Sequence, residues 1–396
     1  MSTALCVVVF SGCGKATDVN SGLDGRGGEA GASGGATTSG NAGNSAGGPE
    51  SDAGGALVDL RPEPPEWLPP FSLGSPGWLA STTPNCVKEQ GSVDAYSVWA
   101  DARGVFSLAS IACNFLAEVP CGAEGLSLMF NPGTGWRSSY ALSAGSPQSS
   151  ELGLTGFPGG PLLMHGVLAD DYGLFLLADG APRNVWKLHG STSVFVTGPK
   201  RAYALDAETV LEWSGDAFRP IATLTSAANA IWADDEVIVV VGNDQSLLVR
   251  PTSGGDFRAV PDVPAGNYTA VWGFAADDLW LGNLPGQLVH YDGKSFQIVD
   301  AALANEPDPA IRGLWGSNGQ LFFRTTYQFG RVARGAARAE RLLQNSGGDV
   351  PRIHVTGMWG RSQDELFLTL MDEGYAKYRC GGLFTVVYDG AEFHAF

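Results

Sequence analysis

The chain has 396 residues, with 55 Gly, 23 Pro and 11 Trp, and only 16% of its residues are charged. Hydrophobic residues make up 44%, which is enough for a buried core and excludes a wholly disordered chain. Acids outnumber bases by 41 to 24, and the resulting net charge of −17 disfavours nucleic acid and anionic membrane surfaces as partners, because both are negatively charged. No apolar run reaches the length of about 18 residues that a transmembrane helix needs.

Residues 1–13 are typical of a bacterial export signal. An apolar run, Ala4 to Phe10, is followed by Ser11, Gly12 and Cys13. A lipoprotein signal peptidase needs small residues before its cysteine, so Phe10-Ser11-Gly12-Cys13 resembles a lipobox, with Phe10 where Leu is usual, and predicts lipidation of Cys13. No Lys or Arg precedes Cys13, and the positive start of a signal is missing. Either the true start lies upstream, or the match is accidental.

Residues 14–57 are expected to form a disordered tether. The stretch from Gly14 to Gly55 contains 14 Gly in 42 residues, a composition that cannot repay its ordering entropy. Its root-mean-square reach is about 35 Å. A lipidated cysteine followed by such a spacer suits a surface-tethered domain. By analogy with lipoproteins, Gly14 in place of Asp after Cys13 implies sorting to the outer membrane; without an anchor the protein would be secreted.

Four further cysteines also favour export. Cys86, Cys113, Cys121 and Cys380 form an even set that allows three pairings. We favour Cys113–Cys121, which are close in sequence, and Cys86–Cys380, which would join the two ends of the folded body. The alternative is four free buried thiols in a reducing compartment.

A repeated unit predicts the fold of residues 58–396, of which the part before about residue 90 is expected to be an N-terminal lead-in segment. Seven positions serve as its anchors: Trp99, Leu168, Phe195, Trp232, Trp272, Trp315 and Trp359. The last four lie 40, 43 and 44 residues apart, and between them short β-branched or aromatic runs are bounded by Gly, Asp, Asn and Pro. Four such strands in about 43 residues make one propeller blade. We therefore predict an all-β propeller of seven blades with four antiparallel strands each, although the uneven early spacing leaves six or eight blades open.

Sheet physics assigns roles within each unit. The tryptophan is expected on the innermost strand, filling the wedge between neighbouring sheets. The acid pairs Asp170-Asp171, Asp234-Asp235 and Asp277-Asp278 are expected to cap the first hairpin, since they recur in register. Asp292-Gly293 and Asp389-Gly390 predict turns between the third and fourth strands.

The units resemble the tryptophan-glycine propeller repeats of secreted lipoproteins in bacterial envelopes. More distantly they are similar to propellers of the photosystem II assembly factor type. The resemblance covers about residues 90 to 396 and implies a propeller fold, with almost nothing about the ligand. The chain has no WD dipeptide closing a blade, no twin-Gly kelch pattern and no Asp-box of the sialidase kind.

Motifs for catalysis and metal binding are missing. The five histidines are His165, His189, His290, His354 and His394, and none is paired at i+2 or i+4. No zinc or calcium pattern occurs, so we expect no metal and no cofactor. His290 is interpreted as a residue on a strand face.

One basic cluster stands out against the acidic background. It consists of Arg331, Arg334, Arg338 and Arg341. It could be a docking patch for an acidic partner or polysaccharide. We favour a solvated insertion after the third strand of the sixth blade.

These observations favour a non-enzymatic binding scaffold, lipid-anchored or secreted, in the cell envelope. We expect a monomer whose protein or glycan ligand meets the loops between second and third strands and between blades, at one end of the channel. The candidate ligand-binding residues are Asn243, Asp244, Asn267, Asn283 and Asp372. The alternatives are a polysaccharide hydrolase or lyase, since propellers also host enzymes, and an assembly factor for an envelope complex.

Overall fold

The computed structural model describes residues 92–112, 125–133, 137–142, 152–168, 171–178, 182–303, 306–344, 353–372 and 384–395. The predictions for Cys13, for the tether and for the disulfides of Cys86, Cys113, Cys121 and Cys380 fall outside these residues and stay predictions. None of the described residues belongs to a helix long and apolar enough to cross a membrane.

The described residues form seven sheets, each made of four strands that are consecutive in sequence. The first three blades contain β1 (Ser92–Asp101), β2 (Gly104–Ala112), β3 (Gly125–Asn131) and β4 (Arg137–Ala141); β5 (Gly153–Gly156), β6 (Leu162–Leu168), β7 (Asp171–Leu177) and β8 (Arg183–Lys187); and β9 (Thr192–Gly198), β10 (Arg201–Asp206), β11 (Thr209–Trp213) and β12 (Phe218–Thr223).

The remaining four blades follow the same order. They contain β13 (Ala228–Ala233), β14 (Val237–Gly242), β15 (Leu247–Pro251) and β16 (Arg258–Ala259); β17 (Tyr268–Ala275), β18 (Asp278–Asn283), β19 (Leu288–Tyr291) and β20 (Phe296–Val299); β21 (Gly313–Ser317), β22 (Gln320–Arg324), β23 (Gln328–Ala333) and β24 (Glu340–Gln344); and β25 (Ile353–Ser362), β26 (Glu365–Asp372), β27 (Phe384–Tyr388) and β28 (Phe393–Ala395).

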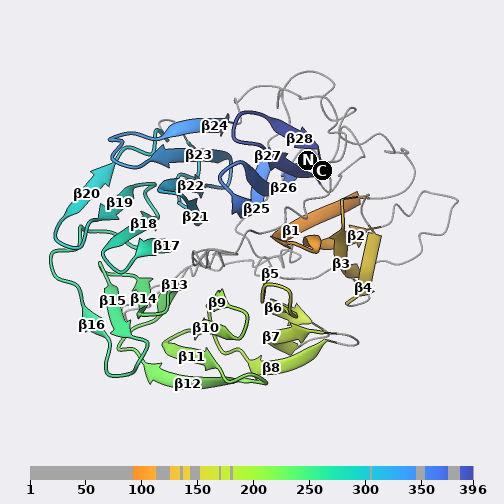
Figure 1. Cartoon of the computed structure of the whole chain (residues 1–396), viewed down its shortest axis with the longest axis horizontal. Coiled ribbons are helices and arrows are strands. Elements are labelled where there is room, and N and C mark those ends of the chain that lie inside the picture. The colour runs from red at the N-terminus through yellow and green to blue at the C-terminus, as the bar shows by residue number, and fades with distance from the viewer. Residues whose placement is uncertain are drawn as a thin grey trace, which may run out of the picture.

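The sheets are arranged in a ring, with the first strand of each sheet nearest the centre (Figure 1). These first strands contact one another in chain order, and β25 packs against β1 to complete the circle. Every pairing within a sheet is antiparallel, as in β1 with β2 and β27 with β28. The chain is therefore a seven-bladed β-propeller, as the repeat spacing predicted.

The inner strands carry the predicted aromatic wedge. Trp99, Trp232, Trp272, Trp315 and Trp359 all lie on first strands and are all buried. Their rings meet across blade boundaries, with centroids 6.1 Å apart for Trp272 with Trp315 and for Trp359 with Trp99. The hydrophobic residues of all seven sheets join into one continuous core around this ring.

The second blade corrects one predicted anchor. Leu168 ends the second strand, β6, and does not lie on an inner strand. The inner strand is β5, where Thr155 occupies the position that aromatic residues hold elsewhere, with Gly156 packed close to the Trp99 ring. Since Thr155 carries no aromatic signal, the sequence pattern does not reveal β5, and the anchors of the early blades are unevenly spaced. Phe195, the other weak anchor, does lie on the inner strand β9.

Turn chemistry is confirmed in part. Asp292 and Asp389 each accept hydrogen bonds from two main-chain N–H groups in turns between third and fourth strands. Asp234 does the same in the first hairpin of blade 4. Asp278 differs: it begins β18, and its carboxylate bonds His290 on the neighbouring strand at 2.7 Å, so it is not a hairpin cap. Asp170 lies outside the described residues.

The two ends of the propeller differ in their connections. Turns between first and second strands and between third and fourth strands contain only two to six residues, and we call that side the turn end. The connections between second and third strands and between blades lie on the opposite side, which we call the loop end. They include the long segments 260–267 and 300–312. Variable chemistry therefore has most room at the loop end.

Candidate functional site

Four of the five predicted ligand-binding residues lie together at the loop end of blades 4 and 5. Asn243 and Asp244 belong to the connection from β14 to β15, and Asn267 directly precedes β17. The Asp244 main-chain N–H donates to the Asn267 side-chain oxygen at 3.2 Å. The main-chain N–H of Leu284, just beyond Asn283, donates to the Asn267 carbonyl at 3.0 Å. The prediction thus selected neighbours in space from two connections and from the end of β18.

Asn283 and Asp372 have different surroundings. Asn283 is fully buried at the end of β18, and its side-chain oxygen accepts from the Gln287 main-chain N–H at 2.7 Å. Its amide therefore closes the turn from β18 to β19. Asp372 ends β26 in blade 7, away from the other four in the ring, and only its backbone pairing with Ile353 is described.

Asn229 was missed by the sequence reading and belongs to the same group. Its side-chain nitrogen donates to the Asn243 side-chain oxygen at 3.0 Å and to the Tyr268 carbonyl at 2.8 Å. The available signal was a polar, non-repeating residue three positions before the anchor Trp232. That signal was weak, because the residue falls inside a strand, β13, and not in a loop.

Backbone strain is concentrated at this end of the molecule. Asp244 and Gln245 are consecutive residues with φ of 55° and 63°, in the left-handed region that normally favours glycine. They are the central pair of a tight turn, closed by a bond from the Ser246 N–H to the Asn243 carbonyl. Ala207, Asp262 and Ala302 also have positive φ and also lie in loop-end connections. Asn318 is the one non-glycine case at the turn end among the described residues.

Blades 5 and 6 bring a group of charged side chains to the loop end. Asp308, in the connection 300–312, accepts hydrogen bonds from the Thr326 hydroxyl at 2.7 Å and from Arg312 at 3.0 Å. Burial raises the pKa of Asp308, but these bonds outweigh it and hold the pKa below its usual value. Glu306 receives a bond from the Gln328 side chain, and burial raises the Glu306 pKa to about 7.

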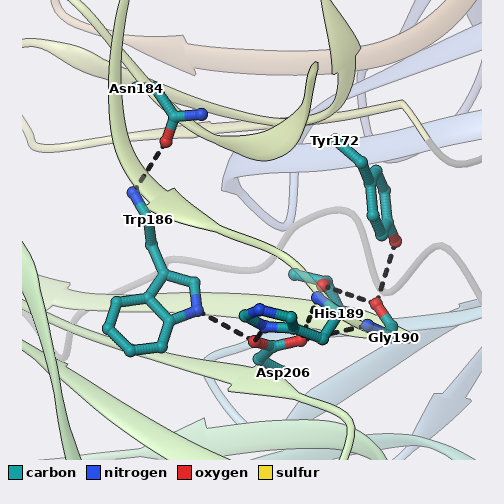
Figure 2. A network of polar contacts seen from close by, with 7 residues as sticks. Tyr172, Asn184, Trp186, His189, Gly190 and Asp206 are labelled. Atoms are coloured by element: carbon teal, nitrogen blue, oxygen red, sulfur yellow. Dashed lines mark hydrogen bonds and ion pairs between the residues drawn. The ribbon is translucent and has the colours of Figure 1, made fainter. Parts of the chain in front are cut away.

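Asp206 is the centre of a second polar network at the loop end, between blades 2 and 3 (Figure 2). Its buried carboxylate accepts from Trp186 Nε1 at 2.9 Å, from the main-chain N–H groups of His189 and Gly190, and bonds His189 Nδ1 at 2.8 Å. Burial raises the pKa of Asp206, but the bonds from His189 and Trp186 outweigh it and keep the pKa low. The Tyr172 hydroxyl donates to the Gly190 carbonyl, which fixes the same connection from the other side.

The five histidines are dispersed over the structure. His189, His290 and His394 each bond an aspartate, and His165, His354 and His394 are buried. His290 lies on the face of β19, stacked on Trp280 at 4.4 Å, as predicted for a strand residue. No group of three or more His, Cys, Asp or Glu side chains in the described ranges is arranged to hold a metal ion.

The four arginines do not form an insertion. Arg331 and Arg341 lie on β23 and β24, and Arg334 and Arg338 lie in the six-residue turn between these strands. Three of them are paired with acids: Arg331 with Glu340 at 2.7 Å, Arg334 with Asp278 at 3.4 Å and Arg338 with Asp300 at 3.1 Å. The cluster is therefore largely neutralised within the described part of the chain.

Comparison with known proteins defines the fold class only. No family model and no curated protein matches the sequence. Among solved structures, the WD40 propeller domain of Doa1 is similar over 78% of this chain and 96% of its own, with 9% identity and a TM-score of 0.52. Virginiamycin B lyase from Staphylococcus aureus is similar over 69% of this chain and 91% of its own, with 11% identity and a TM-score of 0.50. YCF48, solved with a D1 peptide, is similar over 77% of this chain and 94% of its own, with 11% identity and a TM-score of 0.48.

Proposed function

We propose that this chain is a binding module whose partner docks on the loop-end surface, which we define as Asn229, Asn243, Asp244, Gln245 and Asn267. The observation that carries the proposal is the succession of Asp244 and Gln245 in the left-handed region. Each such residue costs on the order of 1–2 kcal/mol, a cost that glycine would avoid. Strain of this kind persists where the side chains serve a purpose, and here Asn243, Asp244 and Gln245 are all exposed.

The chemistry of the loop-end surface favours a protein partner. Side-chain amides both donate and accept hydrogen bonds, as the main chain of a peptide does. None of the five residues is aromatic, so the surface offers no ring on which a sugar could stack. A glycan is the alternative ligand, and it becomes an outcome of the binding experiment.

We further propose that the propeller is held in a bacterial envelope through Cys13. The lipobox-like residues before Cys13, the tether of about 35 Å and the even set of cysteines support this location. A tether of this kind lets the loop end meet a partner at some distance from the membrane surface.

A cross-linking experiment on the full chain tests both parts of the proposal. The chain is matured in a Gram-negative envelope, its mass is measured for an acyl group, and cross-linked partners are identified by mass spectrometry. The variant with Asn243→Ala, Gln245→Ala and Asn267→Ala is expected to capture its partner at least about tenfold less well, a loss of about 1.4 kcal/mol.

The matched control is Asn318→Ala, which changes an exposed residue with φ of 51° at the turn end and is expected to leave capture unchanged. Equal capture by the triple variant and the wild type would contradict the loop-end surface as the docking site. A chain without an acyl group would contradict the anchor alone. Elution of a glycan with no protein would contradict a protein partner and identify a glycan as the ligand.

A second candidate function is acid–base catalysis on a polysaccharide. One observation favours it: the His189 side chain is 69% exposed while Asp206 holds its Nδ1, which leaves Nε2 to meet a substrate. His189→Ala distinguishes the two functions. Capture that survives this change, with no polysaccharide cleaved by the wild type, supports the binding module.

A further inference from the structure

Two buried oxygen atoms lie without donors where the connection 300–312 meets blade 6. Gln328 begins β23 and is 2% exposed, and its Nε2 donates to Glu306 Oε2. Glu306 Oε1 and Gln328 Oε1 are both buried and both lack a hydrogen-bond partner within the described part of the chain. A buried acceptor without a donor is destabilising. Because these two acceptors belong to side chains that already bond each other, a single added proton can satisfy both.

One proton supplies the missing donor. A protonated Glu306 carboxyl can donate its O–H to Gln328 Oε1 while its other oxygen accepts from Gln328 Nε2. The two side chains then form a cyclic acid–amide pair with two hydrogen bonds, and both acceptors are used. When the proton leaves, a negative carboxylate oxygen lies against the carbonyl oxygen of the amide, and the pair repels itself.

We propose that Glu306 and Gln328 form a proton-operated latch that fastens the connection between blades 5 and 6 onto the start of β23. The latch is closed when Glu306 is protonated and opens when Glu306 is ionised. The segment beyond it is held independently, by Asp308 with Thr326 and by the Ile311 N–H bonded to the Asn283 carbonyl. Opening is therefore confined to the residues around Glu306.

The charged groups around Glu306 agree with this chemistry. Burial is the main cause that raises the Glu306 pKa, and the bond from Gln328 Nε2 lowers it. The nearby Asp308 carboxylate raises this pKa further, while Arg341 on β24 lowers it. Arg312 is engaged with Asp308, and Arg324 on β22 donates to the Val355 carbonyl of blade 7. The balance places the Glu306 pKa at about 7, within the range where a cell compartment changes its pH.

The direction of the pH effect follows from linkage. The closed latch has a Glu306 pKa of about 7, whereas an open, solvated glutamate has a pKa of about 4.3. The closed state therefore binds the proton more tightly. The equilibrium constant for closing the latch is highest below about pH 4.3. It falls about tenfold per pH unit between about pH 4.3 and about pH 7, and above about pH 7 it stays at its lowest value.

Hydrogen exchange on the full chain tests the latch. Glu306→Gln cannot ionise, and its amide can still donate to Gln328, so this variant is expected to stay closed at every pH. The readout is the Glu306 amide, whose N–H donates to the Leu303 carbonyl in the part that the latch controls. The ratio of wild-type to variant exchange rates for this amide removes the intrinsic pH dependence of exchange. We expect this ratio to rise by at least about tenfold between about pH 5 and about pH 8.

The matched control is Glu208→Gln, an exposed glutamate in the loop-end connection from β10 to β11, which is expected to give a flat ratio at the same Glu306 amide. A flat ratio for Glu306→Gln as well would overturn the latch. Titration of the wild-type Glu306 carboxyl by NMR keeps the test independent of how the variants fold. A midpoint near 7 supports the latch, and a midpoint at or below the ordinary glutamate value overturns it.

Discussion

Each inner-strand tryptophan lies over a small residue of the next blade. A methyl group added to Gly316 would come within 2.7 Å of Trp272 Nε1, and one added to Gly360 within 2.5 Å of the Trp315 ring. Gly316 and Gly360, which follow Trp315 and Trp359, are therefore needed for their lack of a side chain. Where the ring closes, Trp359 faces Ala100 and donates from Nε1 to its carbonyl at 2.8 Å.

We expect Gly316→Ala to lower the free energy of unfolding by about 1–3 kcal/mol, because a well-packed core accommodates an added methyl group only by moving its neighbours. Chemical denaturation measures the loss. Gly198→Ala is the matched control, since a methyl group there meets nothing within 4 Å. A loss of similar size in both variants would show that the effect comes from glycine replacement in general and not from the contact with Trp272.

Single residues could be assigned from sequence only where their partners lie nearby in the chain. Asp292 and Asp389 were predicted correctly, because a turn cap bonds residues two and three positions further on. Asp278 was not, since its partner His290 lies on the next strand. The reason for Gly316 was hidden in the same way, because Trp272 belongs to the preceding repeat.

At the scale of elements, Asp206 joins the end of β10 to the connection that enters blade 3. Trp186 comes from β8 and His189 from the connection itself, so one carboxylate fastens three segments (Figure 2). A buried acceptor with several donors holds a connection more firmly than packing alone, because each donor would otherwise lose its hydrogen bond. This explains how a short connection stays ordered while His189 remains exposed.

Asp206→Asn is expected to destabilise the protein by about 1–3 kcal/mol at neutral pH, because an amide accepts fewer bonds than a carboxylate. The low pKa of Asp206 means that its contribution is present above the ordinary aspartate pKa, and is lost as pH falls through the folded value. Urea unfolding of both proteins should therefore converge in acid. Asp235→Asn, at an exposed ion pair with Arg201, is the control and should change stability little. A difference for Asp206→Asn that persisted unchanged in acid would contradict this account.

The sequence predicted which segments form strands and turns, but not which connections contact one another. Alternating apolar runs and turn residues identified the strands, and non-repeating polar residues identified Asn243 and Asn267. The connection 300–312 was not selected, although it carries Glu306 and Asp308. Its polar contacts are with Thr326 in another connection and with Gln328 at the start of β23, and a one-dimensional pattern does not reveal that pairing.

At the scale of the whole molecule, the ring is closed by side chains. The first sheet is formed by β1–β4 and the last by β25–β28, each from consecutive strands. Contact between them depends on the packing of β25 against β1, with the Trp359 ring 6.1 Å from that of Trp99. The bond from Trp359 to the Ala100 carbonyl adds a directional component to this closure.

We expect Trp359→Ala to lower stability by about 3–5 kcal/mol and to separate the terminal blades from the rest. Hydrogen exchange measured strand by strand should show that β1 and β25 lose protection first. Trp213→Ala, which removes an equally large buried ring from within blade 3, is the control and should weaken blade 3 instead. Equal protection of β1 and β25 in the two variants would contradict a special role for the closure.

The number of blades could be predicted because the repeat period is recognisable from several units even where individual residues deviate from the pattern. Four regular anchors sufficed to set the period, and the ring needs the same number of strands in every unit. The position of the second blade could not be predicted, because Thr155 replaces the aromatic marker there.

Because the ring closes through β25 and β1, it cannot close until nearly the whole chain has been synthesised. The inner strand that carries Trp99 leaves the ribosome more than 250 residues before the one that carries Trp359. At a translation rate of about 5–20 residues per second, the first blade waits on the order of 10–50 s for its neighbour. During that interval the face of the first blade that later receives Trp359, at Ala100, is uncovered, so the nascent chain should depend on a chaperone until its last forty or so residues emerge.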